Sequence, residues 1–311
     1  MSTSALPPSQ LPPTSLPSSP PAEEPRVNPI LTFGKMVKFS HTIFALPFAL
    51  AAAALAARGV GLPLPRLLAI VVAMAGARTT AMGFNRIVDR RYDARNPRTA
   101  NREIPRGAVS LSAAWALTAA SAVVFVGAAA YLGPLCLALA PVALLFLYGY
   151  SLTKRFTALC HLALGLAIAS GPAGAWIAVR GSFGLVPGLL MLAVGTWIGG
   201  FDVLYALADR DFDRSMGLHS IPARLGVPGA LAVSGALHLV TLAALVALAP
   251  AASLGLFYVA GVAVVGALLV WEHAIVKPSD LSRLNMAFFN LNGYVSVAFL
   301  AAVVADVAFG R

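Results

Sequence analysis

The chain has 311 residues, of which 59% are hydrophobic and 11% are charged. Soluble domains have about 45–50% apolar and about 25% charged residues, so this composition excludes a soluble domain and indicates an integral membrane protein. The net charge is +10. In a chain of apolar segments a basic balance reflects membrane orientation, so we expect no nucleic-acid partner. Cys136 and Cys160 lie in apolar runs without metal-ligand spacing, which gives no support to a disulfide framework or a zinc site.

The first 34 residues differ from the rest of the chain, because Pro and Ser are frequent in them and large apolar side chains are scarce. Such a segment buries too little apolar surface to offset the entropy of ordering, so residues 1–34 are predicted to form a disordered tail. The tail lacks the apolar region of a cleaved secretory signal. Residues 35–311 are predicted to form a single transmembrane domain.

The rest of the chain contains nine apolar runs long enough to cross about 30 Å of hydrocarbon as helices. The predicted spans lie near residues 40–58, 65–89, 111–131, 134–150, 157–178, 185–208, 228–248, 253–272 and 286–307. The expected fold class is therefore an all-α integral membrane protein. An odd number of spans places the two termini on opposite sides of the membrane.

The cationic side chains predict the orientation of these spans. Most of the 22 Lys and Arg residues fall in the N-terminal flank and in the loops after the second, fourth, sixth and eighth spans. Cationic residues accumulate on the cytoplasmic side, so we expect the N-terminus and these loops in the cytoplasm and the C-terminus outside. The expected location is the inner (plasma) membrane, where many of the arginines would contact anionic lipid headgroups.

Two of the cytoplasmic loops resemble each other in sequence. NRIVDRRYDARNPRTANREIPRG follows the second span and YALADRDFDRSMGLHSIPARLG follows the sixth. Each carries two aspartates four residues apart, Asp89 with Asp93 and Asp209 with Asp213, followed by Ile-Pro, Arg and Gly. The separation of about four helices indicates a pseudo-repeat of two four-helix units plus a ninth helix.

The first motif places three oxygen-bearing side chains on one face of a helix. At about 100° per residue, Asn85, Asp89 and Asp93 fall within about 80° of one another. Carboxylates at a membrane edge are costly unless cations neutralise them. Mg²⁺ suits this role because it takes oxygen ligands and is shared between one or two carboxylates and substrate phosphates. The alternative is that these are solvated loop charges paired with arginines.

The second motif repeats the pattern. On a continuous helix, Asp202, Asp209 and Asp213 fall within about 40°, whereas Asp211 points the opposite way and is expected to face solvent. Two clusters in matching positions favour a pair of Mg²⁺ ions, which together with nearby cations would suit a diphosphate. Three histidines show no zinc-ligand spacing and are interpreted as isolated polar positions inside packed helices: His161, His238 and His273.

Arg78 lies inside the second predicted span, seven residues before Asn85. This spacing puts it about 20° from the same helix face and about 10.5 Å deeper. An arginine at that depth requires a polar cavity and an anion, which is either a protein carboxylate or the carboxylate of a bound substrate. A transporter is an alternative explanation for intramembrane Arg and Asp, although transporters usually place the site near the midplane.

These motifs resemble those of the UbiA-type intramembrane aromatic prenyltransferases. The strings NRIVDRRYD, TANREIPRG, YGYSLTKRFT and DVLYALADRDFD carry the resemblance, which extends from about Lys35 to the ninth span. It implies Mg²⁺-dependent transfer of a polyprenyl group from a polyprenyl diphosphate to an aromatic acid acceptor in ubiquinone or menaquinone biosynthesis. Family members that act on haem or chlorophyll precursors share the motifs and are an alternative.

The resemblance also implies roles for individual residues. The first metal and diphosphate motif corresponds to Asn85, Asp89 and Asp93, and the second to Asp202, Asp209 and Asp213. The cations that hold the diphosphate correspond to Arg102 and Lys154, an active-site tyrosine to Tyr150, and an arginine near the acceptor carboxylate to Arg78. The implied catalytic residues are Asp89, Asp209 and Arg78.

The sequence departs from the family at the first span. Lys38 and His41-Thr42 stand where members acting on 4-hydroxybenzoate often have an Arg and a Lys-Pro pair. The stretch GFDVLYALADRDFDRSMGLHSIPARLG resembles more closely the branch that prenylates 1,4-dihydroxy-6-naphthoate. The resemblance therefore leaves two acceptors, 4-hydroxybenzoate and 1,4-dihydroxy-6-naphthoate.

Overall fold

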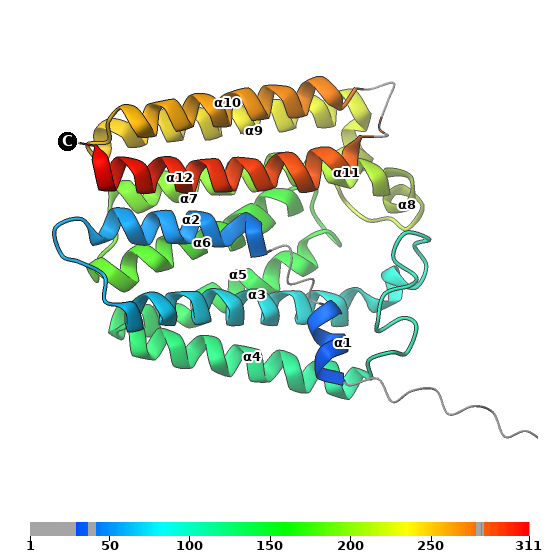
Figure 1. The fold of residues 1–311 in the computed structure, drawn as a ribbon. Helices are drawn as coiled ribbons and strands as arrows, with labels where there is room; N and C mark the ends of the chain where they lie inside the picture. The colour runs from blue at the N-terminus through cyan, green and yellow to red at the C-terminus, as the bar shows by residue number, and fades with distance from the viewer. Residues whose placement is uncertain (1–28, 37–41, 278–280, 282, 311) are drawn as a thin grey trace, which may run out of the picture.

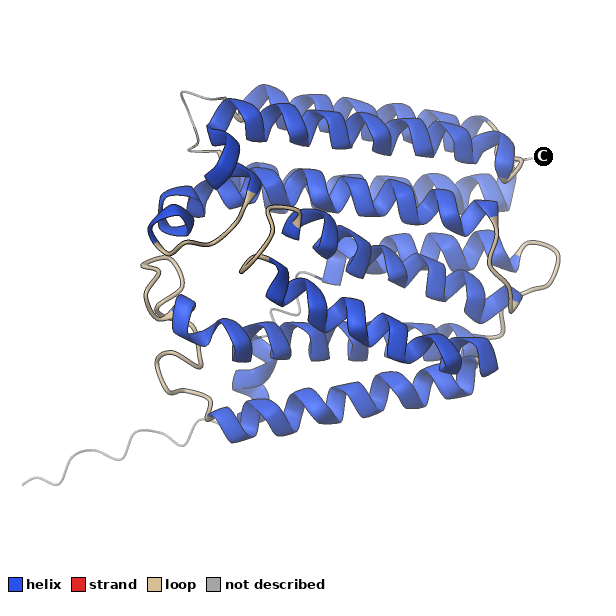
Figure 2. Ribbon diagram, turned by 180° about the vertical axis from the view of Figure 1, so that it is seen from behind, coloured by secondary structure: helices blue, strands red, loops and turns tan. Residues whose placement is uncertain are grey.

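The computed structural model describes residues 29–36, 42–277, 281 and 283–310, which form helices joined by loops (Figures 1 and 2). In chain order the elements are α1 (Pro29–Met36), α2 (Thr42–Ala57), α3 (Leu64–Asp93), α4 (Leu111–Leu132), α5 (Pro134–Thr153), α6 (Cys160–Arg180), α7 (Leu185–Tyr205), η2 (Ala206–Asp209), α8 (Arg210–Ser215), α9 (Ile221–Ala251), α10 (Leu256–Ile275), α11 (Leu284–Met286), η3 (Ala287–Leu291) and α12 (Asn292–Phe309). Among the described residues, eight helices are long and apolar enough to cross a membrane, and the shorter apolar helix Ala45–Ala57 lies within α2. The predicted all-α membrane fold with about nine spans is confirmed.

The long helices lie side by side with their axes roughly parallel, so the bundle has two ends (Figure 1). The loop between α3 and α4 lies at one end together with α8, and the C-terminus lies at the other. Both α3 and α7 run toward the first end, which brings the two acidic motifs to the same end of the bundle. In chain order the spans fall into α2 to α5, then α6, α7, α9 and α10, then α12.

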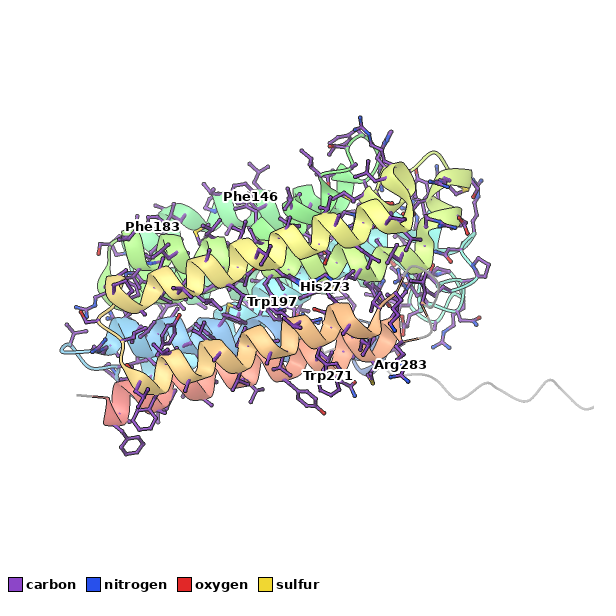
Figure 3. The ribbon with its side chains drawn as sticks, turned by 90° about the horizontal axis from the view of Figure 1, so that it is seen from above. Phe146, Phe183, Trp197, Trp271, His273 and Arg283 are labelled. Carbon is purple, nitrogen blue, oxygen red and sulfur yellow. The ribbon has the colours of Figure 1, made fainter. Side chains whose placement is uncertain are left out.

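Small residues bring the helices into close contact. A Cβ atom added at Gly165 of α6 would overlap the carbonyl oxygen of Gly195 in α7, so the close approach of the two helices leaves no room for a side chain at Gly165. Lipid tails are as apolar as the helices, and packing of this kind therefore contributes much of helix association in membranes. Trp197 is fully buried inside the bundle, whereas Trp271 is 50% exposed and projects from its surface (Figure 3).

Helix α1 overlaps the predicted disordered tail, because residues 29–34 are helical. Proline is tolerated at the start of a helix, where its missing N–H has no partner to lose. Phe33 and Met36 lie one turn apart and are buried, with Met82 and Ile104 packed against them. These two contacts explain why the helix forms at the end of a Pro-rich and Ser-rich segment. The rest of the predicted tail, residues 1–28, lies outside the described residues.

The second acidic motif does not form one continuous helix. α7 ends at Tyr205, and the tighter 3₁₀ turn Ala206–Asp209 separates it from α8. The predicted common helix face for this motif is therefore wrong, because its angles assume an unbroken helix. The outward orientation of Asp211 is confirmed, since its side chain is 80% exposed.

Candidate active site

A cavity of ≈ 390 Å³ lies toward the end of the bundle that carries α8 and the α3–α4 loop. Its walls come from that loop and from α2, α3, α5, α6, α7, η2 and α8. All the site residues predicted from the sequence line this one cavity: Arg78, Asn85, Asp89, Asp93, Arg102, Tyr150, Lys154, Asp202, Asp209 and Asp213. The structure therefore brings the two acidic motifs and the deeper arginine together.

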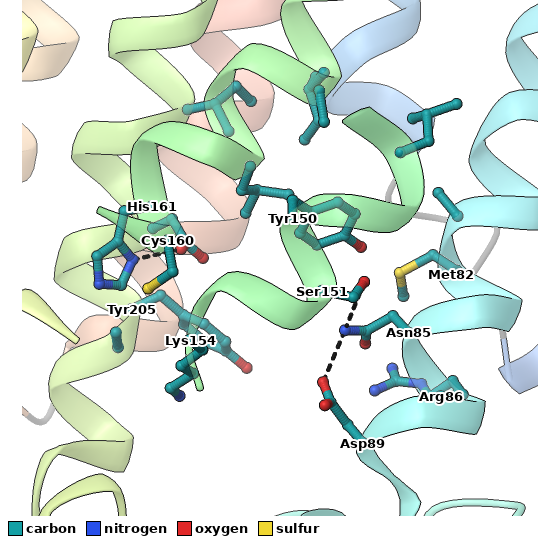
Figure 4. Close-up of a pocket in the computed structure, with 18 of the residues that line it drawn as sticks. Met82, Asn85, Arg86, Asp89, Tyr150, Ser151, Lys154, Cys160, His161 and Tyr205 are labelled. Atoms are coloured by element: carbon teal, nitrogen blue, oxygen red, sulfur yellow. Dashed lines mark hydrogen bonds and ion pairs between the residues drawn. The ribbon is translucent and has the colours of Figure 1, made fainter. Parts of the chain in front are cut away.

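The first motif keeps its predicted ridge because α3 continues without a break to Asp93. Asn85 donates from Nδ2 to Oδ2 of Asp89 at 2.9 Å and to Oγ of Ser151 at 3.3 Å (Figure 4). The second oxygen of Asp89 accepts a hydrogen bond from Arg155 at 3.2 Å. Asp89 is thus held by one neighbour on its own helix and by one cation that follows α5.

Asp93 pairs with Arg102, whose guanidinium nitrogen lies 2.6 Å from Oδ1. The other oxygen of Asp93, Oδ2, is buried and receives no hydrogen bond from the residues that the structure describes. Arg86 is 5% exposed and also lines the cavity. Arg86 is not among the site residues predicted from the sequence, although its spacing of three and seven residues from Asp89 and Asp93 places it near the same helix face.

Asp209 is held by residues of the α3–α4 loop. Its Oδ1 accepts from Nδ2 of Asn96 and from Nε of Arg98, both at 2.9 Å. Arg98 also donates to the hydroxyl of Tyr205 at 2.8 Å. Burial by itself would lower the pKa of Arg98, but its hydrogen bond to Asp209 and the charge of that carboxylate raise the pKa overall. A loop of the first half therefore fixes an acid of the second half.

Asp213 is the most buried acid of the cavity, with a side chain that is 1% exposed. Its Oδ1 lies 2.8 Å from Nζ of Lys154, and Ser220 donates to Oδ2 at 2.8 Å. Burial would lower the pKa of Lys154, but the charge of Asp213 and the hydrogen bond to it outweigh burial and raise the pKa. Lys154 pairs with the second motif and the next residue, Arg155, pairs with Asp89, so two consecutive residues connect the motifs.

Asp202 pairs with His161, which is not among the site residues predicted from the sequence. Nδ1 of His161 lies 2.6 Å from Oδ2 of Asp202. His238 and His273 are not isolated either, because their ring nitrogens lie 3.0 Å apart. The interpretation of these three histidines as isolated polar positions is therefore wrong. Their partners lie on other helices, so spacing along the chain could not reveal them.

The deeper part of the cavity is largely apolar. Arg78 is half-buried and lines it together with four apolar side chains from α6 and α7: Leu164, Ile168, Ile198 and Phe201. Tyr150 points from α5 toward α3 above Ser151 (Figure 4). The departures from the family pattern at Lys38 and His41 lie outside the described residues.

The donor atoms suit a hard divalent cation. Within the described ranges, no three His, Cys, Asp or Glu side chains are grouped so as to hold a metal ion by themselves. Mg²⁺ does not require such a group, because it is often held by one or two carboxylates, waters and substrate phosphates. The buried Oδ2 of Asp93, which has no hydrogen-bond donor among the described residues, is an oxygen that such an ion could engage.

A multi-pass helical bundle with paired acids and cations in one cavity fits a membrane enzyme or a membrane transporter. The chain belongs to the UbiA prenyltransferase family, whose sequence model matches residues 45–294. It is therefore a prenyltransferase, an enzyme that transfers an alkyl group. Family membership favours this class over the transporter considered from the sequence.

Its relatives include two bacterial enzymes named 4-hydroxybenzoate octaprenyltransferase. The protein of Aeromonas hydrophila is 32% identical over 247 residues, which cover 79% of this chain and 85% of the relative. The protein of Aromatoleum aromaticum is 30% identical over 232 residues, which cover 75% of this chain and 79% of the relative.

Solved structures share the fold. An apo UbiA homologue from Aeropyrum pernix superposes with a TM-score of 0.79 at 37% identity, covering 86% of this chain and 98% of the homologue. A UbiA homologue from Archaeoglobus fulgidus, bound to DMAPP and Mg²⁺, superposes with a TM-score of 0.68 at 17% identity, covering 88% and 99% of the two chains.

Proposed function

We propose that the protein transfers a polyprenyl group from a polyprenyl diphosphate to an aromatic acid, with Mg²⁺, in this cavity. The observation that carries the proposal is the meeting of both acidic motifs, their cations and the deeper Arg78 in one space. The part of the cavity next to the α3–α4 loop offers charges for a diphosphate and metal ions. The deeper part offers apolar walls and a single guanidinium for an aromatic carboxylate.

The cations are arranged to receive the diphosphate. Arg98, Arg102 and Lys154 each pair with a carboxylate, line the cavity and have side chains that are 24–35% exposed. A diphosphate would compete for these cations through charge-assisted hydrogen bonds. The carboxylates that they release would become available to a divalent ion. Metal and diphosphate are therefore expected to bind cooperatively.

Six residues would hold the metal ions: Asn85, Asp89, Asp93, Asp202, Asp209 and Asp213. When bound, Mg²⁺ stabilises the negative charge that builds on the leaving diphosphate. The Archaeoglobus fulgidus homologue, which is bound to DMAPP and Mg²⁺, supports this part of the proposal. The remaining steps depend on how this chain orients its substrates and excludes water.

Arg78 would orient the acceptor. A guanidinium can grip a planar carboxylate with two parallel hydrogen bonds, which lysine cannot reproduce. The apolar side chains around it, among them Ile198 and Phe201, would keep water from the reacting allylic carbon. Tyr150 lies between this region and the acidic motifs and would contact the substrates there.

The acceptor that the comparisons support is 4-hydroxybenzoate, because that compound is in the name of both relatives above. The motif sequence favours 1,4-dihydroxy-6-naphthoate as the second candidate. Both are aromatic rings that carry a carboxylate and a hydroxyl, so both satisfy the same requirement at Arg78. The corresponding pathways are ubiquinone and menaquinone biosynthesis.

The enzyme would lie in the inner (plasma) membrane, with its cavity opening toward the cytoplasm. The site loops and the C-terminus lie at opposite ends of the bundle, which agrees with an odd number of spans (Figure 1). The excess of cationic residues at the cavity end indicates the cytoplasmic side. We assign residues 35–311 to the transmembrane catalytic domain and residues 1–34 to its N-terminal extension; α1 spans this boundary and packs on the bundle through Phe33 and Met36.

The test is a product analysis. Purified protein in lipid nanodiscs is incubated with a radiolabelled polyprenyl diphosphate, Mg²⁺ and one aromatic acid at a time, with haem and chlorophyll precursors as further acceptors. We expect a prenylated aromatic acid that forms only with Mg²⁺. No product with any aromatic acid, or product only with a haem or chlorophyll precursor, would contradict the proposal.

A further inference from the structure

The acids of the cavity form five ion pairs among the described residues, and that of His161 with Asp202 is the one whose basic partner is buried. The side chain of His161 is 2% exposed, and its Nδ1 lies 2.6 Å from Oδ2 of Asp202. The side chain of Asp202 is 25% exposed and lines the cavity. Figure 4 shows His161 at the cavity wall, joined to this carboxylate by a dashed line.

The second ring nitrogen of His161 is also fixed. The backbone N–H of Ile221, the first residue of α9, donates to Nε2 at 3.3 Å. Only a ring nitrogen without a proton accepts a hydrogen bond. The proton of the neutral ring therefore lies on Nδ1, which donates it to Asp202. The ring of this α6 residue therefore donates to α7 and accepts from α9, and the two hydrogen bonds hold it in one orientation.

The other acids of the cavity have different partners. Their cations are long side chains that are partly exposed: Arg98 35%, Arg102 24%, Lys154 33% and Arg155 35%. An incoming diphosphate can draw such side chains away from their carboxylates. His161 has no comparable access to the cavity, and its hydrogen bond from Ile221 anchors it. Asp202 is thus the acid whose basic partner an incoming diphosphate can reach least.

We propose that His161 is a positioning residue that holds Asp202 through Oδ2 so that the carboxylate presents its other oxygen to a divalent cation in the cavity. Residues that orient metal ligands in this way raise metal affinity by fixing the ligand before the metal arrives. His161 acts through Asp202 and not on the substrate. This inference rests on the proposed function, because it requires a divalent cation at the acidic motifs.

Substituting His161 by Asn or by Gln distinguishes the contribution of Nδ1 from that of Nε2. The side-chain nitrogen of Asn can occupy the place of Nδ1, whereas the longer side chain of Gln places its amide near Nε2. H161N therefore retains a donor for Asp202, and H161Q loses it. H161F fills the ring volume without any donor and carries the test if H161Q does not fold. H238Q is the matched control, since His238 is equally buried at 2% exposed and does not line the cavity.

The measurement is binding of Mn²⁺ to each purified protein, followed by electron paramagnetic resonance of the free ion, first with Mn²⁺ alone and then with a non-reactive polyprenyl thiodiphosphate present. We expect H161Q and H161F to bind about 10–100-fold more weakly than the wild type. H161N and the H238Q control should remain close to the wild type. The thermal unfolding midpoint of each variant is recorded, because a purely structural histidine would change that midpoint and leave Mn²⁺ affinity intact.

Two results overturn the inference while leaving the proposed function standing: wild-type Mn²⁺ affinity in H161Q and H161F, or affinity in H161N as weak as in H161Q. A wild-type protein that binds no Mn²⁺ in either titration overturns the inference together with the metal part of the proposed function. The two failures are therefore distinguishable in one series of titrations.

Discussion

Replacing Lys154 by Met removes a cation that has two functions in the structure. It neutralises Asp213, whose side chain is 1% exposed, across a distance of 2.8 Å. It also lies in the cavity wall where the diphosphate is proposed to bind. Methionine keeps much of the length and apolar stem of lysine, so the change isolates the charge.

The stability effect follows from burial. Leaving a buried charge without its partner costs about 3–5 kcal/mol when both groups are fully buried. One third of the Lys154 side chain is exposed, and Ser220 still donates to Asp213 in the variant. We therefore expect the free energy of unfolding to fall by the smaller amount of a charged hydrogen bond, about 1.5–3 kcal/mol. Losing the same bond to the diphosphate would weaken its binding by about 10- to 150-fold.

The assay combines unfolding in mixed SDS micelles with titration of a non-reactive polyprenyl thiodiphosphate. In K154M both stability and affinity should fall, and acceptor affinity should change less. Adding D213N removes the unpaired charge, so the double variant should regain most of the stability but not the affinity. R210Q is the control, because Arg210 pairs with Asp211 on an exposed surface. Unchanged thiodiphosphate affinity in K154M, or full recovery of that affinity in the double variant, would refute the diphosphate contact.

Four further predictions follow from the same site. D89N and D209N should each abolish turnover while the protein remains folded, whereas D211N should remain active; normal turnover in either of the first two contradicts a two-motif site. Excess EDTA should stop product formation and added Mg²⁺ should restore it, so full activity in EDTA would show that no divalent ion is needed. R78K should raise the apparent acceptor KM by about 10–100-fold. An acceptor without its carboxylate should then lose affinity on the wild type but little on R78K, and additive losses would show that Arg78 does not touch the carboxylate. Because the pKa of Lys154 is raised, the stability from its ion pair should be fully present below the usual lysine range and disappear only as pH rises through the raised pKa. The measurement is the unfolding free energy of the wild type against that of the K154M/D213N double variant as a function of pH. A loss of the ion pair's stability between neutral and mildly alkaline pH would contradict the raised pKa.

The sequence was sufficient for the features that depend on local periodicity. Apolar runs of span length predict the helices, because a membrane leaves few other backbone arrangements. The ridge of Asn85, Asp89 and Asp93 was predictable since α3 runs without interruption from Leu64 to Asp93. Arg86 was predictable in the same way, because its spacing from Asp89 on this continuous helix places it near the same face.

Features that depend on contacts between distant segments were not predictable from one sequence. Asp209 is fixed by Asn96 and Arg98, which are 113 and 111 residues away. The common helix face predicted for the second motif was wrong because of the 3₁₀ turn that precedes α8. That turn, Ala206–Asp209, contains no Pro or Gly that would have indicated a break in the helix. The contact of His161 with Asp202 depends on the register of α6 against α7, which the packing of small residues such as Gly165 determines.

The central claim is that one diphosphate binds between the two acidic motifs and takes over cations that hold carboxylates in its absence. The most direct measurement is an experimental structure of the protein with Mg²⁺ and a polyprenyl thiodiphosphate. The account predicts the diphosphate between Asp89 and Asp209, with Arg98 and Lys154 contacting its oxygens instead of their present carboxylate partners. A diphosphate bound outside the cavity, or inside it with both of these ion pairs unchanged, would contradict the account.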